Sequence, residues 1–195
     1  MEPIRSFIAI ELPDELKQLL SRLQTQLKAG QNPSVKWVDP SGIHLTLKFL
    51  GTTGSHQIGD ITKVIRESTE GFSPFHLEVS ELGVFPNLKQ VRVVWVGLSG
   101  EVDRLGQLQR RLESGLTSVG FTAESRAFKP HLTLARVRDW ASPAEQSSLG
   151  QLIAATGLTI SYAFRADTIS LMKSTLTREG AIYHQIDSVR LQKAL

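Results

Sequence analysis

The tetrapeptide His-Leu-Thr-Leu occurs twice in the chain, at residues 44–47 and again 87 positions later at residues 131–134. Side chains alternate between the two faces of a β-strand, so the histidine and threonine of each copy share one face. The leucines of each copy then share the opposite face. This pattern predicts two strands in sheets that helices cover on one side only, each with a polar pair on its open side.

The sequence around each tetrapeptide also repeats. Four leucines at helical spacing, residues 16, 19, 23 and 27, recur 89 positions later at residues 105, 108, 112 and 116. Each half shows the order strand, helix, strand, HLTL strand, helix, strand, which indicates an internal duplication. We therefore expect residues 1–195 to form one domain of two pseudo-symmetric lobes, with one HLTL motif in each lobe.

Hydrophobic periodicity and turn residues give the expected elements. Helices are predicted over residues 14–29, 56–70 and 101–119, and from the Ser142 capping box to about residue 155. Strands are predicted over residues 7–12, 35–38, 43–50, 75–85, 91–98, 121–128, 131–137, 162–173 and 181–191. If a pseudo-two-fold axis relates the halves, their open faces meet across a cleft, and two imidazoles and two hydroxyls converge there.

Composition excludes several classes of protein. The 195 residues include no cysteine, which excludes disulfides, thiolate zinc sites, iron–sulfur clusters and cysteine nucleophiles. No apolar stretch approaches the ~20 residues of a membrane span, and the first residues lack a signal-peptide core. We expect a cytoplasmic protein that does not bind membranes. The formal net charge of +3 is compatible with a polyanionic partner but is weak evidence for one.

Two histidines beside two threonines suit the chemistry of a phosphodiester. Because the imidazole pKa is about 6.5, near neutral pH one ring can be neutral and the other protonated. The neutral ring can deprotonate an attacking water, and the protonated ring can donate a proton to the departing ribose oxygen. Hydroxyls of Thr46 and Thr133 can bind the non-bridging phosphate oxygens. This chemistry requires no cofactor and no metal, and the histidines lack metal-ligand spacing.

In its doubled motif the chain resembles the two-histidine (2H) phosphoesterase superfamily, and within it the RNA 2′,3′-cyclic phosphodiesterase branch, also called 2′–5′ RNA ligase-like. The resemblance covers nearly the whole chain. It also rests on Arg5-x-Phe7-x-Ala9-Ile10, Lys36-Trp37-Val38, Gly83-x-Phe85-Pro86, Trp95-Val96-Gly97 and Phe128-Lys129-Pro130.

The resemblance implies an α+β, bilobal duplicated fold, in which two antiparallel sheets face a central cleft with helices on the outer faces. It implies hydrolysis of RNA-terminal 2′,3′-cyclic phosphate to a 2′-phosphomonoester, with His44 as proton donor and His131 as proton acceptor. It also matches Arg136 to an arginine that holds phosphate. The expected partner is RNA with a 2′,3′-cyclic end, for which tRNA fragments are one candidate source, and the expected state is a monomer.

Strand parity bears on two further phosphate-binding candidates. Arg136 should face away from His131 unless a β-bulge intervenes. Lys48 lies an even number of residues from His44 and Thr46, so on a regular strand it shares their face. It is therefore the best lysine for steering RNA phosphates. Aromatic residues at strand positions belong more often to the core, so we expect at most one or two of them to stack a terminal base. The candidates are Phe7, Trp37, Phe49, Phe85, Trp95 and Tyr183.

Other readings of the same residues stay open at this point. The site can act on a small cyclic-phosphate or 2′–5′-linked nucleotide, or the chain can be a non-catalytic nucleotide- or RNA-binding module. A metal-dependent hydrolase is a further alternative. By microscopic reversibility, the same site can also join a cyclic end to a 5′-hydroxyl and form a 2′–5′ bond.

Overall fold

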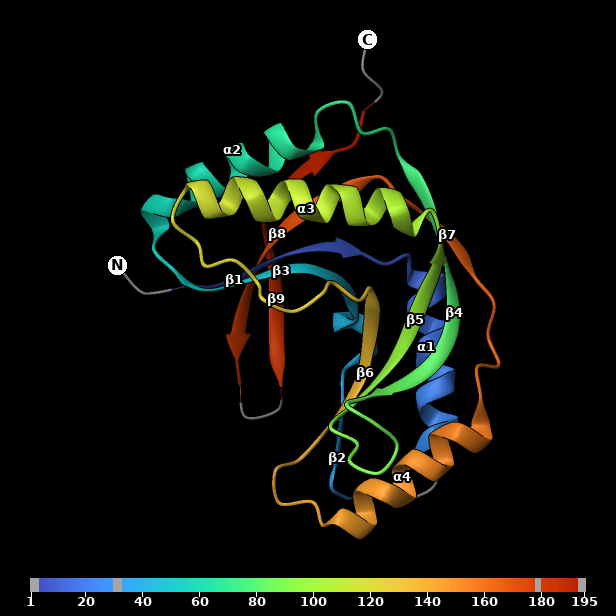
Figure 1. Ribbon diagram of the computed structural model, residues 1–195. Coiled ribbons are helices and arrows are strands. Elements are labelled where there is room, and N and C mark those ends of the chain that lie inside the picture. The colour runs from blue at the N-terminus through green and yellow to red at the C-terminus, as the bar shows by residue number, and fades with distance from the viewer. Residues whose placement is uncertain (1–3, 30–32, 178–179, 193–195) are drawn as a thin grey trace.

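The computed structural model describes residues 4–29, 33–177 and 180–192. The described helices are α1 (Asp14–Lys28), α2 (Ile58–Thr69), α3 (Val102–Ser118) and α4 (Pro143–Thr156), with short 3-10 turns at Pro40–Gly42 and Ser55–Gln57. The described strands are β1 (Ile4–Glu11), β2 (Val35–Trp37), β3 (His44–Thr53), β4 (Phe75–Phe85), β5 (Val93–Gly100), β6 (His131–Val137), β7 (Ala163–Ala166), β8 (Thr168–Leu176) and β9 (Ala181–Arg190) (Figure 1).

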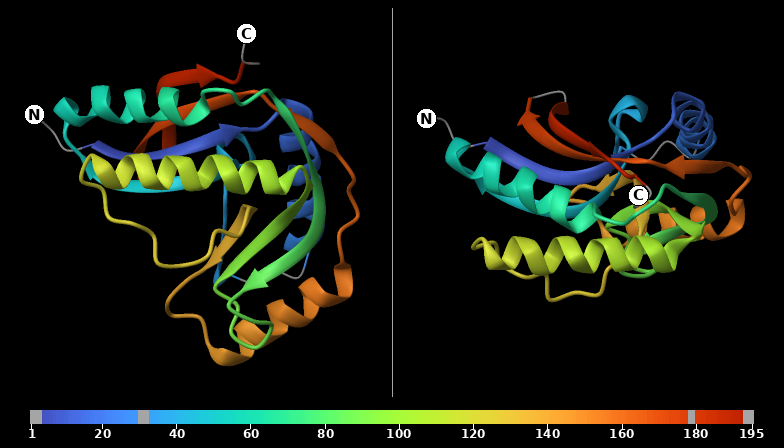
Figure 2. Two further views of the ribbon diagram at one scale, coloured as in Figure 1. Left: turned by 45° about the horizontal axis from the view of Figure 1, so that its top comes forward. Right: turned by 90° about the horizontal axis from the view of Figure 1, so that it is seen from above.

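All of these strands belong to one antiparallel sheet that curls strongly. Its order is β7-β4-β5-β6-β3-β1-β8-β9, and β2 pairs with β6 off this path. The two HLTL strands, β3 and β6, meet in the middle through the Cα pair Leu45–Leu132. Figures 1 and 2 show β1, β3, β8 and β9 diverging from β4, β5 and β6 on the two sides of this junction. The predicted α+β class is confirmed, and the two predicted sheets are joined into one at this pair.

The helices form where the leucine spacing predicts them, and they bury every leucine of that pattern except Leu19, which is half-buried. The buried residues of α1 include Leu16, Leu20, Leu23 and Leu27, and those of α3 include Leu105, Leu108, Leu112 and Leu116. The capping box of Ser142 and Glu145 begins α4, as predicted. Helix α3 contacts β3 and α2 contacts β9, whereas α4 contacts β4. The helices thus cover the leucine side of the sheet and leave the histidine side open.

One predicted strand is absent and another is divided into two. Residues 121–128, all of which the structure describes, form no strand. In this segment the carbonyl of Thr122 and the amide of Glu124 bond the side chains of Lys48 and Glu113 instead of a neighbouring strand. The predicted strand over residues 162–173 is divided at Asp167. Its first part, β7, pairs with β4 at one edge of the sheet, and its second part, β8, pairs with β1 near the other edge.

The described helices include none that is both long and apolar enough to cross a lipid bilayer.

Gly150 lets α4 approach the turn between β4 and β5 very closely. A Cβ atom added to Gly150 would lie 1.9 Å from the carbonyl oxygen of Leu88, a distance that backbone movement alone can relieve. We expect Gly150→Ala to lower the free energy of unfolding, although alanine favours helices by about 1 kcal/mol over glycine. The measurement is denaturant unfolding of the purified variants.

The matched control is Gly106→Ala in α3. There a Cβ atom would meet only the end of the Arg110 side chain, at 3.4 Å. This variant should gain roughly 0.5–1 kcal/mol from helix propensity. If Gly150→Ala stabilised the protein as much as Gly106→Ala does, the close approach of α4 to Leu88 would be contradicted.

Candidate active site

The His44 side chain lies at the start of β3 in an aromatic setting. Its Nδ1 is 2.7 Å from the carbonyl oxygen of Gly42. A carbonyl only accepts, so Nδ1 carries the hydrogen and Nε2 is the nitrogen left for a ligand. The ring stacks on Phe7 with centroids 4.5 Å apart and meets the edge of Tyr183 at 5.0 Å. These contacts fix the plane of the imidazole.

The His131 side chain at the start of β6 repeats this arrangement. Its Nδ1 is 2.7 Å from the carbonyl oxygen of Lys129, which again lies two residues earlier in the chain. The ring meets Phe85 edge to face at 5.1 Å and Trp95 at 6.4 Å. Both histidines are therefore held through Nδ1 by the local backbone, and each has Nε2 available to give or accept a proton.

The pairing of Leu45 with Leu132 brings the two motifs together. In an antiparallel pair, the residue before one partner lies beside the residue after the other. His44 is therefore next to Thr133, and Thr46 is next to His131. All four side chains are half-buried, whereas the leucines that alternate with them are buried. The predicted polar face thus combines both His-x-Thr pairs.

A β-bulge in β6 places Arg136 on that same face. The register with β5 shifts between Thr133 and Ala135, so that Leu134 and Ala135 are both buried and Arg136 is exposed. The extra residue in β6 moves Arg136 from the face opposite His131, where a regular strand would put it, to the face of His131. The positive charge of Arg136 also acts electrostatically on Tyr183, whose ring contacts that of His44. Burial raises the pKa of the Tyr183 hydroxyl, and the charges of Arg136 and Arg5 oppose that rise.

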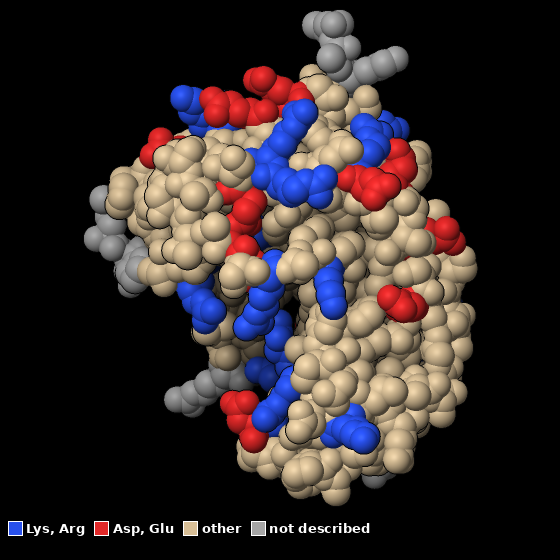
Figure 3. Space-filling view, viewed as in Figure 1, with Lys and Arg blue, Asp and Glu red and all other residues tan. Residues whose placement is uncertain are grey.

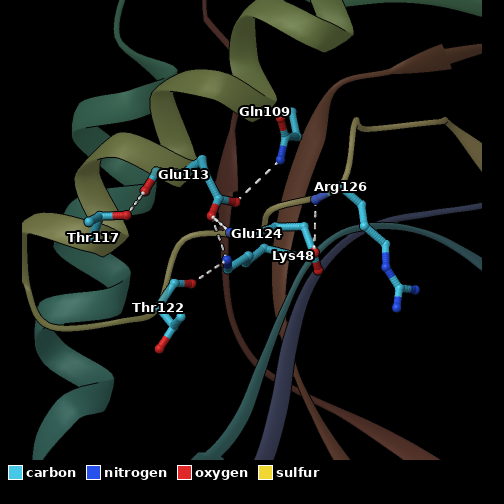
Figure 4. A network of polar contacts seen from close by, with 7 residues as sticks. All are labelled: Lys48, Gln109, Glu113, Thr117, Thr122, Glu124 and Arg126. Carbon is cyan, nitrogen blue, oxygen red and sulfur yellow. Dashed lines mark hydrogen bonds and ion pairs between the residues drawn. The ribbon is translucent and has the colours of Figure 1, made fainter.

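The expectation for Lys48 is wrong, because a matching irregularity in β3 turns its side chain the other way. The register with β1 shifts next to Leu47, so that Leu47 and Lys48 are both buried. The Lys48 ammonium donates to Glu113 at 2.5 Å and to the carbonyl of Thr122 at 2.8 Å, beneath α3 (Figure 4). Lys48 is thus neutralised in the protein interior and is not available to a phosphate.

Phe49 lies on the open face, at the position where a regular strand would have placed Lys48. Its side chain is 66% exposed, and its ring centroid is 6.1 Å from that of Phe7. Phe7 in turn stacks on His44, and a large exposed aromatic side chain at this distance from the histidine can stack a nucleobase.

Sequence reasoning missed two carboxylates beside the histidines. Glu11 is the strand partner of His44, and its Oε1 accepts a hydrogen bond of 2.9 Å from Ser170. The side chain of Glu81 lies over Gly97, which is the strand partner of His131. Neither glutamate lies at a recognisable sequence distance from the histidines. Each comes close to a histidine only because their two strands are neighbours in the sheet. Within the described part of the chain, no group of three or more His, Asp or Glu side chains is arranged to hold a metal ion.

Comparison with known proteins gives consistent matches along the chain. The family described as the 2′-5′ RNA ligase superfamily matches residues 12–178. An RNA 2′,3′-cyclic phosphodiesterase of Methanothermobacter thermautotrophicus is 35% identical over 188 residues, which cover 96% of this chain and 99% of the relative. A protein of the same name from Aquifex aeolicus is 27% identical and covers 98% of this chain and 99% of its own length.

Solved structures share the fold. The TT0787 protein of Thermus thermophilus has a TM-score of 0.81 at 24% identity, with 97% of this chain and 99% of the other covered. The Escherichia coli LigT protein, solved in complex with 3′-AMP, has a TM-score of 0.78 at 24% identity, with 98% of this chain and all of the other covered.

Burial holds the pKa of His44 below its ordinary value of 6.5, against the opposing effects of the Gly42 carbonyl and Glu11. The folded protein therefore binds this proton less tightly than the unfolded chain does. Stability should fall as the pH drops below 6.5, since protonation then favours the unfolded state. In an NMR titration, the His44 ring should protonate below pH 6.5.

The His44→Gln variant removes this titrating group. Its free energy of unfolding should therefore fall less than that of the parent between about pH 7.5 and about pH 5. A His44 ring that titrates at or above 6.5 would show that burial is not the dominant effect.

Proposed function

The chain belongs to the 2′-5′ RNA ligase superfamily, and on that basis we propose that it is an RNA 2′,3′-cyclic phosphodiesterase whose two histidines act as general acid and base. The observation that carries this proposal is the junction of β3 and β6, where two His-x-Thr pairs share one open face. Each histidine there has Nδ1 bonded to a backbone carbonyl, which leaves Nε2 to give or accept a proton.

In the proposed reaction, Nε2 of His131 removes a proton from water as the water oxygen attacks the cyclic phosphorus. The bond from phosphorus to the ribose 3′-oxygen breaks on the opposite side, and Nε2 of His44 donates a proton to that oxygen. The product is a 2′-phosphomonoester. Each proton transfer of this kind contributes typically about 10²- to 10⁴-fold to the rate.

The other polar groups of the open face act on the phosphate. The hydroxyls of Thr46 and Thr133 donate to its non-bridging oxygens, where negative charge accumulates in the transition state. The guanidinium of Arg136 adds positive charge and can bind two of these oxygens at once. Burial makes protonated His44 a stronger acid, and the negative charge of the bound phosphate favours its protonation.

The same site supports ligation of a 2′,3′-cyclic end to a 5′-hydroxyl. The 5′-hydroxyl takes the place of the water and gives up its proton to His131 as its oxygen attacks phosphorus. The bond from phosphorus to the 3′-oxygen breaks, His44 protonates that oxygen, and the product is a 2′–5′ phosphodiester. We propose that the protein works as a cytoplasmic monomer on RNA fragments, of which tRNA fragments are one candidate source. Its single domain consists of two lobes that arose by duplication.

The decisive substitutions are His44→Ala and His131→Ala. The substrate is a short RNA with a 2′,3′-cyclic end, with EDTA present to remove divalent metal ions. Each variant should lose about 10²-fold or more in kcat, since each lacks one proton-transfer group. Far-UV circular dichroism should show unchanged secondary structure.

His76→Ala is the matched control, because His76 is a 71% exposed histidine on β4 that pairs with Glu101 outside the site. It should retain full turnover. Most activity retained by either motif variant would contradict the two-histidine mechanism. Activity that EDTA abolishes and a divalent ion restores would favour a metal-dependent hydrolase.

The regiochemistry of the product tests the assignment of the leaving oxygen. Hydrolysis should yield the 2′-phosphomonoester, which chromatography separates from the 3′ isomer. A 3′-phosphate product would mean that the 2′-oxygen departs, and would overturn the proposed orientation of the ribose.

A further inference from the structure

The segment between α3 and β6, residues 119–130, contacts one motif strand and leads directly into the other. Near its beginning, the carbonyl of Thr122 accepts a hydrogen bond from Lys48 in β3, the strand that begins with His44. The amide of Glu124 donates to Glu113 Oε1 at 2.6 Å, so the same carboxylate holds both Lys48 and this segment. At its other end, the segment continues directly into His131. We call it the bridging segment.

A groove separates the bridging segment from α3. Its volume is about 630 Å³, and it is lined on the helix side by Arg110 and Ser114 and on the other side by Arg126 and Phe128. Figure 4 shows the Arg126 side chain extending from the bridging segment away from α3. One wall of the groove is therefore the bridging segment, which is fixed to both motif strands.

The charges of the groove favour an anion. Glu113 is paired with Lys48, so the remaining charged side chains of the groove are Arg110 and Arg126 against the single carboxylate of Glu124. Within the described residues, the guanidinium groups of Arg110 and Arg126 form no ion pair with a carboxylate. In the space-filling view, lysine and arginine side chains border the hollowed centre of this face (Figure 3).

We propose that this groove binds the RNA backbone on the 5′ side of the cyclic phosphate, with Arg126 and Arg110 contacting its phosphates. The inference rests on the proposed function, which places the cyclic phosphate between His44 and His131. Arg126 is five residues from His131, so at most about 18 Å separates their Cα atoms. A short single strand can span that distance.

Backbone contact here makes the protein sensitive to the length of the RNA. Phosphate contacts carry no sequence information and weaken as salt rises, because binding releases counterions from the nucleic acid. The groove thus distinguishes an RNA chain from a mononucleotide with the same cyclic end, and does so independently of its bases.

The test compares a mononucleoside 2′,3′-cyclic phosphate with a tetranucleotide of the same terminal nucleoside. For Arg126→Gln and Arg110→Gln, KM for the tetranucleotide should rise about fivefold, while both substrates keep their kcat and the mononucleotide keeps its KM. The slope of log KM against log salt should become shallower by about 0.7 for each phosphate that the variant no longer binds. Arg66→Gln, which alters an exposed arginine on α2, is the matched control and should change none of these values.

Equal effects on both substrates, or no effect on either, would overturn the groove proposal even if the parent is fully active. A parent that hydrolyses neither substrate would contradict the proposed function. In that case, fluorescence anisotropy with a labelled tetranucleotide still decides the question. Binding weakened about fivefold by Arg126→Gln, but not by Arg66→Gln, supports the groove, and equal binding by all three proteins overturns it.

Discussion

The rest of the site depends on the backbone pairing of Leu45 with Leu132. This pair joins β3 to β6 in the middle of the sheet and sets His44 beside Thr133 and Thr46 beside His131. A shift of register by one residue would turn the polar side chains toward the helices and the leucines toward the cleft. All four leucines of the two motifs are buried, so such a shift would carry a large hydrophobic cost. The hydrophobic core thereby fixes the position of groups that belong to the open face.

The irregularities that follow each motif make the two halves of the site different. In β3 the buried pair is Leu47 and Lys48, and Phe49 reaches the open face. In β6 the buried pair is Leu134 and Ala135, and Arg136 lies on the open face. One side of the site therefore offers an aromatic surface and the other a cation. Lys48 is compensated in the interior by Glu113, and removing one partner of such a buried pair leaves an uncompensated charge.

Much of this could be predicted from the sequence, because the strongest signals are periodic. The leucine spacing of α1 and α3 and the alternation within both motifs follow from local geometry, and the structure confirms them. Bulges are not periodic, so strand parity gave the wrong side for Lys48 and counted against Arg136. The segment over residues 121–128 has a strand-like composition, but two of its backbone groups form hydrogen bonds with the side chains of Lys48 and Glu113 instead of with a neighbouring strand. Glu11 and Glu81 lie near the histidines only because particular strands are neighbours, which the sequence does not state.

The central claim is that His44 and His131 serve one phosphate, and an NMR titration tests it most directly. The ligand is adenosine 2′-monophosphate, which represents the proposed product, and the ring signals of both histidines are followed as it is added. The account predicts that both sets of signals shift along curves described by one common dissociation constant. Shifts confined to one histidine, or two distinct constants, would contradict a shared site.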